Sequence, residues 1–276
     1  MKVAIFHNSQ KNNADMCALK VADILHSLGI EIFADFDRKG FYKSKDYIKF
    51  DDFSKIAKSS DIVIAIGGDG TILQCSKYLI GSNTKLLGIN TGHLGFMASM
   101  EVSQLNELKR LITGEYDVIP RMMLKISTSN GYSFEALNDV SIIRQYSRIF
   151  DFSVKLNDFP MGNYRADGII FSTPTGSTAY SLSAGGSIIE PDVKCIEMVL
   201  VSPHLLGVRP MIFSPEKKLT FSHSCNENDI FFSVDGNSPI KIGANVEMIV
   251  EKSKNTINII DIMSNTFYKK LNKIRL

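Results

Sequence analysis

The chain has 276 residues, with 31 Lys and Arg against 29 Asp and Glu and a formal net charge of +2. This length favours two moderate domains over one large domain, and the balanced charge argues against nucleic acid or a membrane surface as a partner. No apolar stretch reaches membrane-spanning length and the N-terminal apolar run is too short for a signal peptide, so small molecules are the expected partners.

The first part of the chain alternates apolar runs with stretches of helical spacing. The apolar runs cover residues 2–7, 30–34, 62–66 and 85–90, and the helical stretches cover 15–28, 53–58, 71–79 and 102–112. Alternating strands and helices predict a parallel sheet with helices on its faces, and runs without polar alternation are typical of strands buried on both sides. The sequence therefore predicts a Rossmann-like α/β domain over residues 1–119.

Between residues 114 and 120 the pattern changes to an alternation with a period of two. Short alternating runs follow at 123–128, 132–137, 140–144, 150–156, 168–171, 218–221, 230–234 and 246–251, and Asn130-Gly131 predicts a tight hairpin. These runs predict a β-sandwich domain at residues 120–252. Phe267, Leu271 and Ile274 have helical spacing, so we expect a C-terminal helix that returns to the first domain and adds residues 253–276 to it.

The first motif with chemical meaning is Gly67-Gly68-Asp69-Gly70-Thr71, which directly follows the apolar run at 62–66 and opens a helical stretch. Open α/β sheets bind ligands at the carboxyl ends of their strands. Three glycines let backbone N–H groups face a phosphate, and the following helix N-terminus adds favourable partial charge. Asp69 would then be a lone carboxylate beside anions; the alternative is a strand-to-helix turn in which Asp69 caps the helix. The chain has neither a Walker loop nor a GxGxxG motif.

A hydroxyl-rich segment runs from Ser172 to Gly186. Seven of its fifteen residues are serine or threonine, and Pro174 and Gly176 indicate a loop. Such a loop offers many donors and acceptors to a sugar or a base edge, and Tyr180 could stack on an adenine. The alternative is a hydroxyl-rich, capped helix start with Tyr180 in the core.

Two polar pairs could add to such a site. Asn138-Asp139 stands between two apolar runs, and an amide beside a carboxylate can bind a ribose diol by donating and accepting together. A turn or bulge is the alternative for this pair. Arg165 and Asp167 precede the hydroxyl-rich segment, and a solvated surface ion pair is their alternative.

The histidines and cysteines indicate no metal site. They show neither HExxH nor a close ligand pair: His7, His26, His93, His204, His223, Cys17, Cys75, Cys195 and Cys225. We therefore expect no metal held by the protein itself, and reduced thiols in a cytoplasmic protein. The chain also lacks a Gly-x-Ser-x-Gly motif, so it offers no hydrolase nucleophile of that kind.

Together these motifs resemble the NAD kinase family. The resemblance rests on GGDGT at 67–71, GINTGHLGF at 88–96, Asn138-Asp139 and STPTGSTAYSLSAGG at 172–186, which stand in the family's order over almost the whole chain. GGDGT alone is shared with lipid kinases and phosphofructokinases. The two longer motifs narrow the resemblance to NAD kinases. It implies an enzyme that forms NADP from NAD, with ATP accompanied by Mg²⁺ as the donor, NAD bound between an α/β domain and a β-sandwich, and a homodimer or homotetramer.

The resemblance also implies roles for single residues. Asp69 matches the catalytic aspartate that takes the proton from the 2′-hydroxyl of the adenosine ribose, and Asn138 and Asp139 match the pair that holds NAD. Thr175 matches a position beside the adenine. The phosphate-donor loop would be Gly67, Gly68, Gly70 and Thr71. The remaining positions that match dinucleotide contacts are Gly70, Arg148, Arg165, Asp167, Thr178, Ala179, Tyr180, Ser181, Leu182, Ser183, Ser202 and Asn237.

Two positions depart from the family pattern. Many members carry Glu where this chain has Asp139, and Leu205 replaces a hydroxyl residue in the segment from Pro203 to Pro210. The second departure leaves open whether ATP, another triphosphate or polyphosphate is the donor. The residues alone also leave two other functions open: a lipid or sugar kinase with the same glycine-rich loop, and a dinucleotide sensor without turnover.

Overall fold

The computed structural model describes residues 1–8, 12–92, 95–205, 207–225, 229–264 and 266–272. It divides into two compact units, Met1–Pro120 with Ile257–Leu276, and Arg121–Thr256. The chain passes from one unit to the other inside two long strands, β7 (Asp117–Thr128) and β18 (Met248–Asp261). The bounds expected from the sequence, 119/120 and 252/253, lie one and four residues before those of the units. No turn residue marks the second passage, because β18 continues through it.

Unit 1 is built on a parallel sheet. Its strand order is β18, β5 (Lys85–Asn90), β4 (Ile62–Gly67), β1 (Lys2–His7), β2 (Glu31–Asp35), β3 (Ile48–Asp51), and β6 (Met100–Glu101) also pairs with β5. Every pairing along this path is parallel. All six residues of β4 are buried, as its uninterrupted apolar run predicts.

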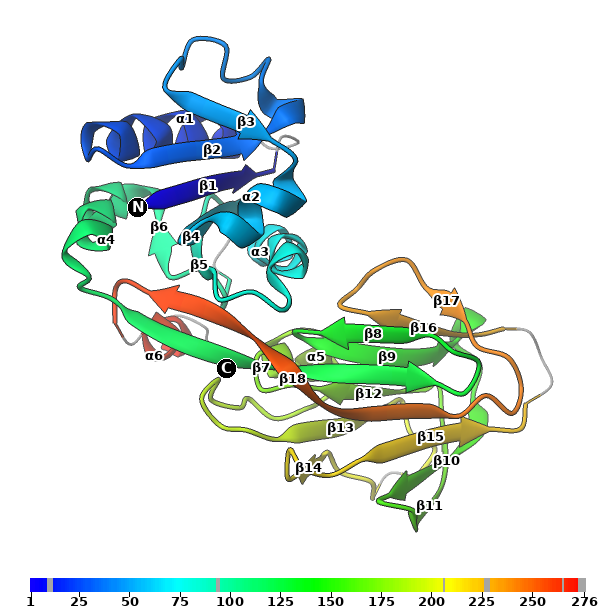
Figure 1. Cartoon of the computed structure of the whole chain (residues 1–276). Coiled ribbons are helices and arrows are strands. Elements are labelled where there is room, and N and C mark those ends of the chain that lie inside the picture. The colour runs from blue at the N-terminus through cyan, green and yellow to red at the C-terminus, as the bar shows by residue number, and fades with distance from the viewer. Residues whose placement is uncertain (9–11, 93–94, 206, 226–228, 265, 273–276) are drawn as a thin grey trace. The chain divides into compact units, whose positions relative to one another are not determined.

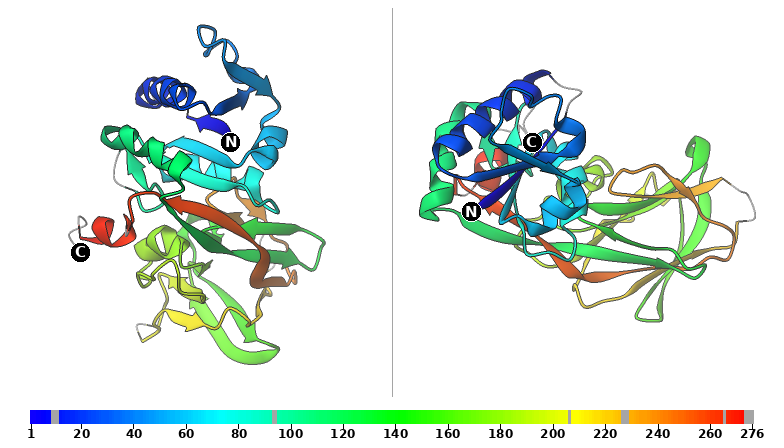
Figure 2. Two further views of the ribbon diagram at one scale, coloured as in Figure 1. Left: turned by 60° about the vertical axis from the view of Figure 1, so that its left-hand side comes forward. Right: turned by 45° about the horizontal axis from the view of Figure 1, so that its top comes forward.

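Helices cover both faces of this sheet (Figures 1 and 2). The helical elements of unit 1 are α1 (Asn12–Ser27), η1 (Phe36–Arg38), α2 (Phe53–Ser59), α3 (Asp69–Ser76), η2 (Lys77–Leu79), η3 (Val102–Lys109), α4 (Arg110–Thr113) and α6 (Thr266–Leu271). Residues of α1, η3 and α4 share one apolar cluster with β1, β4 and β5, which includes Leu25, Ile64 and Leu108. The expected α/β domain is therefore confirmed.

Two expected helices differ in detail. The stretch predicted at 102–112 is mostly a 3-10 helix, η3, with one α-helical turn before Gly114, whose φ of 74° ends it in the left-handed conformation. The C-terminal helix is confirmed as α6 in unit 1. Ile274, which helped to predict it, lies outside the described residues.

Unit 2 contains two sheets that share one core. The first contains β11 (Phe159–Ala166), β10 (Phe150–Leu156), β15 (Leu219–His223), β18, β7 and β8 (Ser133–Ala136); the second contains β14 (Met211–Phe213), β13 (Ile196–Val201), β12 (Gly168–Ser172), β9 (Asp139–Arg144), β16 (Ile230–Val234) and β17 (Ile240–Lys241). Phe152 and Phe221 of the first sheet and Ile142 and Phe171 of the second belong to a single apolar cluster. The expected β-sandwich is therefore confirmed. Short helices η4 (Gln145–Ser147), η5 (Gly176–Thr178) and α5 (Tyr180–Ser183) complete the unit.

Some strands were not expected from the sequence. β11 is an exposed strand at the end of its sheet that contains Pro160 and Gly162, so it lacks the alternation of a half-buried strand. β18 was expected only over residues 246–251, because Ser253 takes a buried position where an apolar side chain would mark the strand. The Ser253 hydroxyl is satisfied there by a hydrogen bond to Glu135.

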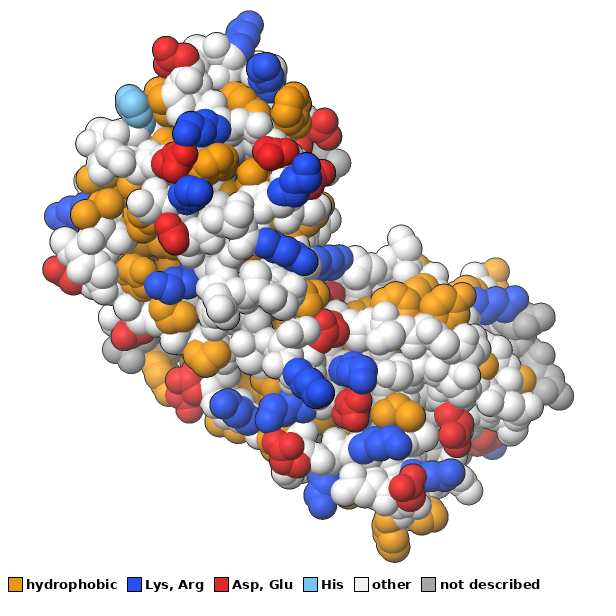
Figure 3. Space-filling model, viewed as in Figure 1, with side chains coloured by type: hydrophobic (Ala, Val, Ile, Leu, Met, Phe, Trp, Pro, Cys, Tyr) orange, Lys and Arg blue, Asp and Glu red, His pale blue; other side chains and the backbone are white. Residues whose placement is uncertain are grey.

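The described helices include none that combines the length and the apolar character needed to cross a membrane. On the face drawn in Figure 3, acidic and basic side chains are interspersed.

Candidate active site

The glycine-rich loop lies at the carboxyl end of the buried strand β4, where Gly67 ends the strand and Asp69 begins α3. A side chain at Gly67 would bring its Cβ within 2.6 Å of Thr71 Cβ, so this position admits only glycine. A Cβ on Gly68 or Gly70 would meet nothing within 4 Å. Packing inside the fold therefore does not require glycine at either position, and the backbone there can be approached from outside.

The Asp69 carboxylate is held by a second loop. Oδ2 accepts a hydrogen bond from the Phe96 N–H at 2.7 Å, and Oδ1 accepts one from the Met97 N–H at 3.1 Å. Gly68, not Asp69, is the N-cap residue of α3, so the alternative in which Asp69 caps the helix is wrong. A Cβ on Gly95 would lie 2.5 Å from Asp69 Cγ, so glycine at 95 lets the two loops close on one another.

The two glycine-containing motifs of unit 1 share one edge of the sheet. Gly67 pairs in register with Asn90, and the Thr91 N–H donates to Gly67 O at 3.3 Å. The Asn90 side chain accepts from the Gly92 N–H at 3.1 Å. His93 and Leu94 of the same motif lie outside the described residues. Parallel pairing thus places 67–71 and 88–92 next to each other, as expected at the carboxyl edge of such a sheet.

In unit 2, the Asn138-Asp139 backbone is held by a carboxylate that sequence reasoning missed. Asp235 accepts hydrogen bonds from the N–H groups of Leu137 at 2.9 Å, Asn138 at 2.7 Å and Asp139 at 3.2 Å. Asp235 and Gly236 have positive φ values of 52° and 65°, so they form a tight turn directly after β16. The Asp-Gly dipeptide after the apolar run at 230–234 was the signal that could have found it.

The polar atoms of Asn138 and Asp139 have unusual surroundings. Asn138 Oδ1 is buried and has no hydrogen-bond partner among the described residues. Asp139 is 5% exposed. Burial, followed by the charge of Asp235, raises the pKa of Asp139 from 3.8 to about 7. A buried acceptor without a partner and a carboxyl that titrates near neutrality are features of a binding site.

The hydroxyl-rich segment uses most of its hydroxyls to build itself. Thr173 Oγ1 donates to Leu137 O at 2.6 Å, Ser177 Oγ to Pro174 O at 2.7 Å and Ser181 Oγ to Glu197 Oε2 at 2.6 Å. Thr173, Ser177 and Ser181 are fully buried. The expectation that these hydroxyls face a sugar is corrected, because buried hydroxyls must be satisfied and protein acceptors satisfy these.

The same segment packs directly on Asn138. A Cβ on Gly176 would lie 2.5 Å from the Asn138 carbonyl carbon, and the Thr173 N–H donates to that carbonyl at 2.8 Å. Thr175, 9% exposed, lies between them in the chain. The hydroxyl-rich segment is therefore in direct contact with the Asn138-Asp139 pair.

Tyr180 begins α5 and is 41% exposed, so the alternative that places it in the core is wrong. Burial, and then the charges of Asp139 and Asp167, raise the pKa of Tyr180. Its hydroxyl therefore lies within electrostatic range of two other predicted site residues. Next to it in the chain, Thr178 and Ala179 are half-buried, as is Leu182, whereas Ser183 is exposed.

The remaining predicted residues lie at the ends of strands and in turns. Arg165 is exposed on β11, and its Nε lies 3.9 Å from Asp151, so its ion pair is with Asp151 and not with Asp167. The Asp167 N–H donates to Val201 O at 3.0 Å, which brings Asp167 beside Ser202, the next residue. Asn237 donates its side-chain amide to Val234 O at 2.6 Å and stabilises the Asp235-Gly236 turn. Arg148 is exposed after η4.

Comparison with known proteins decides the family. Residues 3–116 match the model of the ATP-NAD kinase N-terminal domain, and residues 137–262 match that of the ATP-NAD kinase C-terminal domain. The chain belongs to the NAD kinase family. The two matched regions include every predicted site residue of this family member.

Its relatives cover most of its length. The NAD kinase of Clostridium perfringens strain 13 is 35% identical in an alignment of 280 positions that covers 98% of this chain and 97% of the relative. The NAD kinase of Caldanaerobacter subterraneus is 36% identical over 221 residues, 78% of each protein.

Two solved structures share the fold. Yeast NADH kinase complexed with NADH has a TM-score of 0.90 at 22% identity and covers 99% of this chain and 87% of its own. An Archaeoglobus fulgidus NAD kinase in complex with ATP has a TM-score of 0.78 at 22% identity and covers 99% of this chain and 100% of its own.

Proposed function

We propose that the chain phosphorylates the 2′-hydroxyl of the adenosine ribose of NAD, with ATP as the donor, to give NADP, and that Asp69 accepts the proton. Membership of the NAD kinase family carries the reaction. The role of Asp69 is supported by its carboxylate, which is fixed by the Phe96 and Met97 N–H groups at the carboxyl end of β4 and does not cap α3.

The donor loop consists of Gly67, Gly68, Gly70 and Thr71. The open space at Gly68 and Gly70 leaves room for phosphate oxygens to meet backbone N–H groups, and the start of α3 adds favourable partial charge. Phosphoryl transfer proceeds through a loose transition state whose charge lies on the phosphoryl oxygens, so positioning and charge stabilisation are what the protein must provide.

Mg²⁺ enters with ATP as part of the substrate and offsets the charge of its phosphates. In the described ranges, no group of three or more His, Cys, Asp or Glu side chains is arranged to hold a metal ion. In the proposed reaction the triphosphate binds the metal.

NAD binding falls to unit 2. Asn138 Oδ1 would accept a hydrogen bond from a ribose hydroxyl, and Asp139 would bind the neighbouring hydroxyl. Tyr180 offers an exposed ring to the adenine beside Thr175. Because the Ser181 hydroxyl is occupied by Glu197, Ser181 would contribute through its backbone. The other proposed contacts are Gly70, Arg148, Arg165, Asp167, Thr178, Ala179, Leu182, Ser183, Ser202 and Asn237.

The proposed proton transfer does not require Asp69 to be a strong base. A carboxylate is a weak base towards an alcohol, so its benefit lies in orientation and in accepting the proton late in the reaction. Each carboxylate oxygen of Asp69 uses one acceptor position on a backbone N–H, which fixes the plane of the group and leaves other lone pairs for the ribose hydroxyl.

We also propose a homodimer or homotetramer in the cytoplasm. An assembly would give exposed apolar side chains of unit 2 a place to be buried: Phe159 is 72% exposed, Leu205 65% and Ile212 54%. All four cysteines are free thiols, the usual form in a reducing compartment. Mass in solution with and without NAD measures the assembly.

One assay tests the reaction against its rivals. Purified protein is incubated with NAD, ATP and Mg²⁺, and NADP is measured by anion-exchange chromatography; parallel samples contain diacylglycerol in place of NAD. NADP formation is the expected result. Phosphorylated lipid would support a lipid kinase instead, and NAD binding without product would support a sensor. Replacing ATP by another triphosphate or by polyphosphate, and NAD by NADH, measures donor and acceptor preference.

A further inference from the structure

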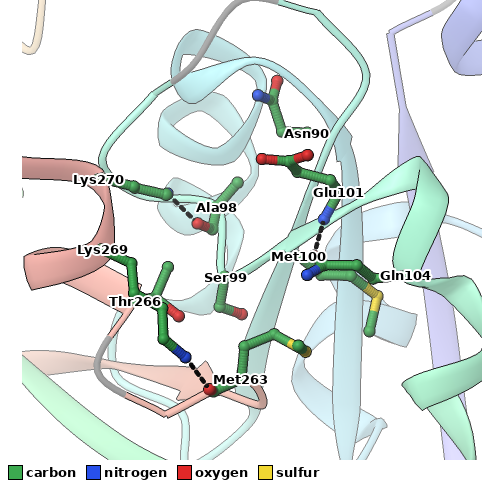
Figure 4. A pocket seen from close by; sticks show the side chains of 10 residues that line it. All are labelled: Asn90, Ala98, Ser99, Met100, Glu101, Gln104, Met263, Thr266, Lys269 and Lys270. Carbon is green, nitrogen blue, oxygen red and sulfur yellow. Dashed lines mark hydrogen bonds between the residues drawn. The ribbon is translucent and has the colours of Figure 1, made fainter. Parts of the chain in front are cut away.

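The segment from Gly95 to Ala98 connects Asp69 to the C-terminal helix of unit 1. Two of its N–H groups, those of Phe96 and Met97, donate to the Asp69 carboxylate. The next residue, Ala98, turns its carbonyl to α6, where it accepts a hydrogen bond from Lys270 Nζ. Figure 4 shows the Lys270 side chain pointing at this carbonyl.

Lys270 is an unusual lysine because it is only 8% exposed. Burial of an ammonium group is costly unless polar partners offset it. We therefore expect the polar contacts of Lys270 to have a role in the protein. A second contact joins the same elements: the rings of Phe96 and Phe267 lie 5.9 Å apart between centroids. Both contacts link α6 to the segment that holds Asp69.

The segment is also tightly packed elsewhere. A Cβ on Gly88 would lie 2.9 Å from Ala98 Cα, and a Cβ on Gly95 would lie 2.5 Å from Asp69 Cγ. Beside Lys270, however, there is free space. A cavity of about 80 Å³ is lined by Ala98, Ser99, Met100 and Lys270, among others, and Ser99 Oγ is buried there without a partner in the described part of the chain (Figure 4). Without the bond from Lys270, the segment has room to shift.

We propose that Lys270 is a positioning residue of the phosphoryl transfer, which acts through the Ala98 carbonyl to keep the Phe96 and Met97 N–H groups on Asp69. The proposal rests on the proposed role of Asp69 as proton acceptor. A shift of about 1 Å at a reacting group can lower turnover about 100-fold, so loss of this hydrogen bond should affect kcat more than substrate binding.

The test compares K270M with K269M. Lys269 belongs to the same helix and donates to the carbonyls of Met263 and Ser264 at 2.9 Å each, so its loss removes hydrogen bonds from α6 without touching Ala98. We expect K270M to lower kcat by roughly 10- to 100-fold while KM for NAD and ATP changes less than about threefold, and K269M to retain wild-type kcat. Equal losses in both variants, or a K270M loss confined to KM, would overturn the proposal.

A double-mutant cycle separates this proposal from the role of Asp69. If Lys270 acts through Asp69, K270M should lower turnover less than about twofold in a D69N background, because coupled residues are not additive. A full additional loss would overturn the inference about Lys270 alone. An unchanged rate in D69N itself would instead overturn the role of Asp69. If K270M fails to fold, as judged by circular dichroism, K270A carries the same cycle, since alanine also removes the donor to Ala98 and needs no space in the core.

Discussion

Asp139 and Asp235 are hydrogen-bonded through their backbone N–H groups, yet the surroundings of their carboxyl groups differ. Three backbone N–H groups donate to the Asp235 carboxylate and fix its position. Burial and the charge of Asp235 raise the pKa of Asp139 to about 7. We infer that Asp235 serves as an anchor for the backbone, whereas Asp139 keeps a carboxyl whose protonation state a ligand can change.

Replacement of Asp139 by Asn should remove a pH dependence of stability. The pKa of Asp139 is higher in the folded chain, about 7, than its ordinary value of 3.8, so the protonated form stabilises the fold. This contribution is complete below pH 4 and is lost as the pH rises towards 7, and it amounts to about 4 kcal/mol in total. Urea unfolding at pH 5 and pH 8 measures the part lost between these two values, about 3 kcal/mol.

The D139N variant should therefore gain stability relative to the wild type between these two pH values. D151N, at an exposed carboxylate of the same unit, serves as a control whose difference from the wild type should stay constant. A D139N difference that does not change with pH would show that Asp139 is ionised throughout.

At the level of elements, the turn from β4 to α3 uses glycine for two different reasons. Gly67 has no room for a side chain because Thr71 packs against it, whereas Gly70 has open space around it. Packing inside the fold therefore explains glycine at position 67 but not at position 70. This is the difference expected if a ligand approaches Gly70.

The paired variants G67A and G70A test this difference. G67A should lower the free energy of unfolding by about 1–3 kcal/mol, as overpacking does. G70A should leave it unchanged or slightly higher, since alanine favours a helix over glycine, and should raise KM for ATP because the added methyl group would face the phosphates in the proposed donor loop. Urea unfolding and steady-state kinetics measure the two effects; a wild-type KM for ATP in G70A would contradict the assignment of the donor loop.

Sequence patterns predicted the elements of unit 1 better than those of unit 2. An uninterrupted apolar run such as 62–66 must be buried on all sides, and it forms the buried strand β4. Strand β11 escaped prediction because an edge strand can be polar, and β18 was cut short because a satisfied serine replaced an apolar residue. The hydrophobicity of a segment does not show whether it lies at the edge of a sheet or which distant side chain satisfies its polar groups.

The same limit applies to the candidate site. The motifs around Asp69 and Tyr180 stand out as short runs, so they could be predicted. Asp235 and Lys270 could not, because each acts on a backbone group far away in the chain: Asp235 on residues 137–139 and Lys270 on Ala98. The hydroxyl-rich run also misled in part, since composition cannot tell hydroxyls that face a ligand from hydroxyls that hold a loop.

For the whole molecule, two separate apolar cores support the division into units. One cluster lies entirely in Met1–Pro120 and Ile257–Leu276, and the other lies entirely in Arg121–Thr256. Unit 2 is one continuous piece of chain, whereas unit 1 needs Ile260 and Ile262 from the C-terminal part to complete its core. The two units should therefore differ in their ability to fold alone.

A fragment of residues 121–256 should unfold cooperatively in urea, since it retains its whole core. A fragment of residues 1–120 should not, because it lacks strand β18 at the edge of its sheet and the two isoleucines. The chain has no tryptophan, so circular dichroism is the suitable measurement. A broad, non-cooperative transition in the fragment of residues 121–256 would show that the core of unit 2 does not suffice for independent folding.

The measurement that tests the central claim most directly is turnover of NAD to NADP by the wild type and D69N, with ATP and Mg²⁺ at saturation. The wild type should form NADP, and D69N should lose about 10²- to 10⁴-fold in kcat while it retains most of its affinity for NAD. Asparagine keeps the shape of the side chain but cannot take the proton. NADP formation at an equal rate in both proteins would contradict the role of Asp69, and its absence in the wild type would contradict the proposed reaction.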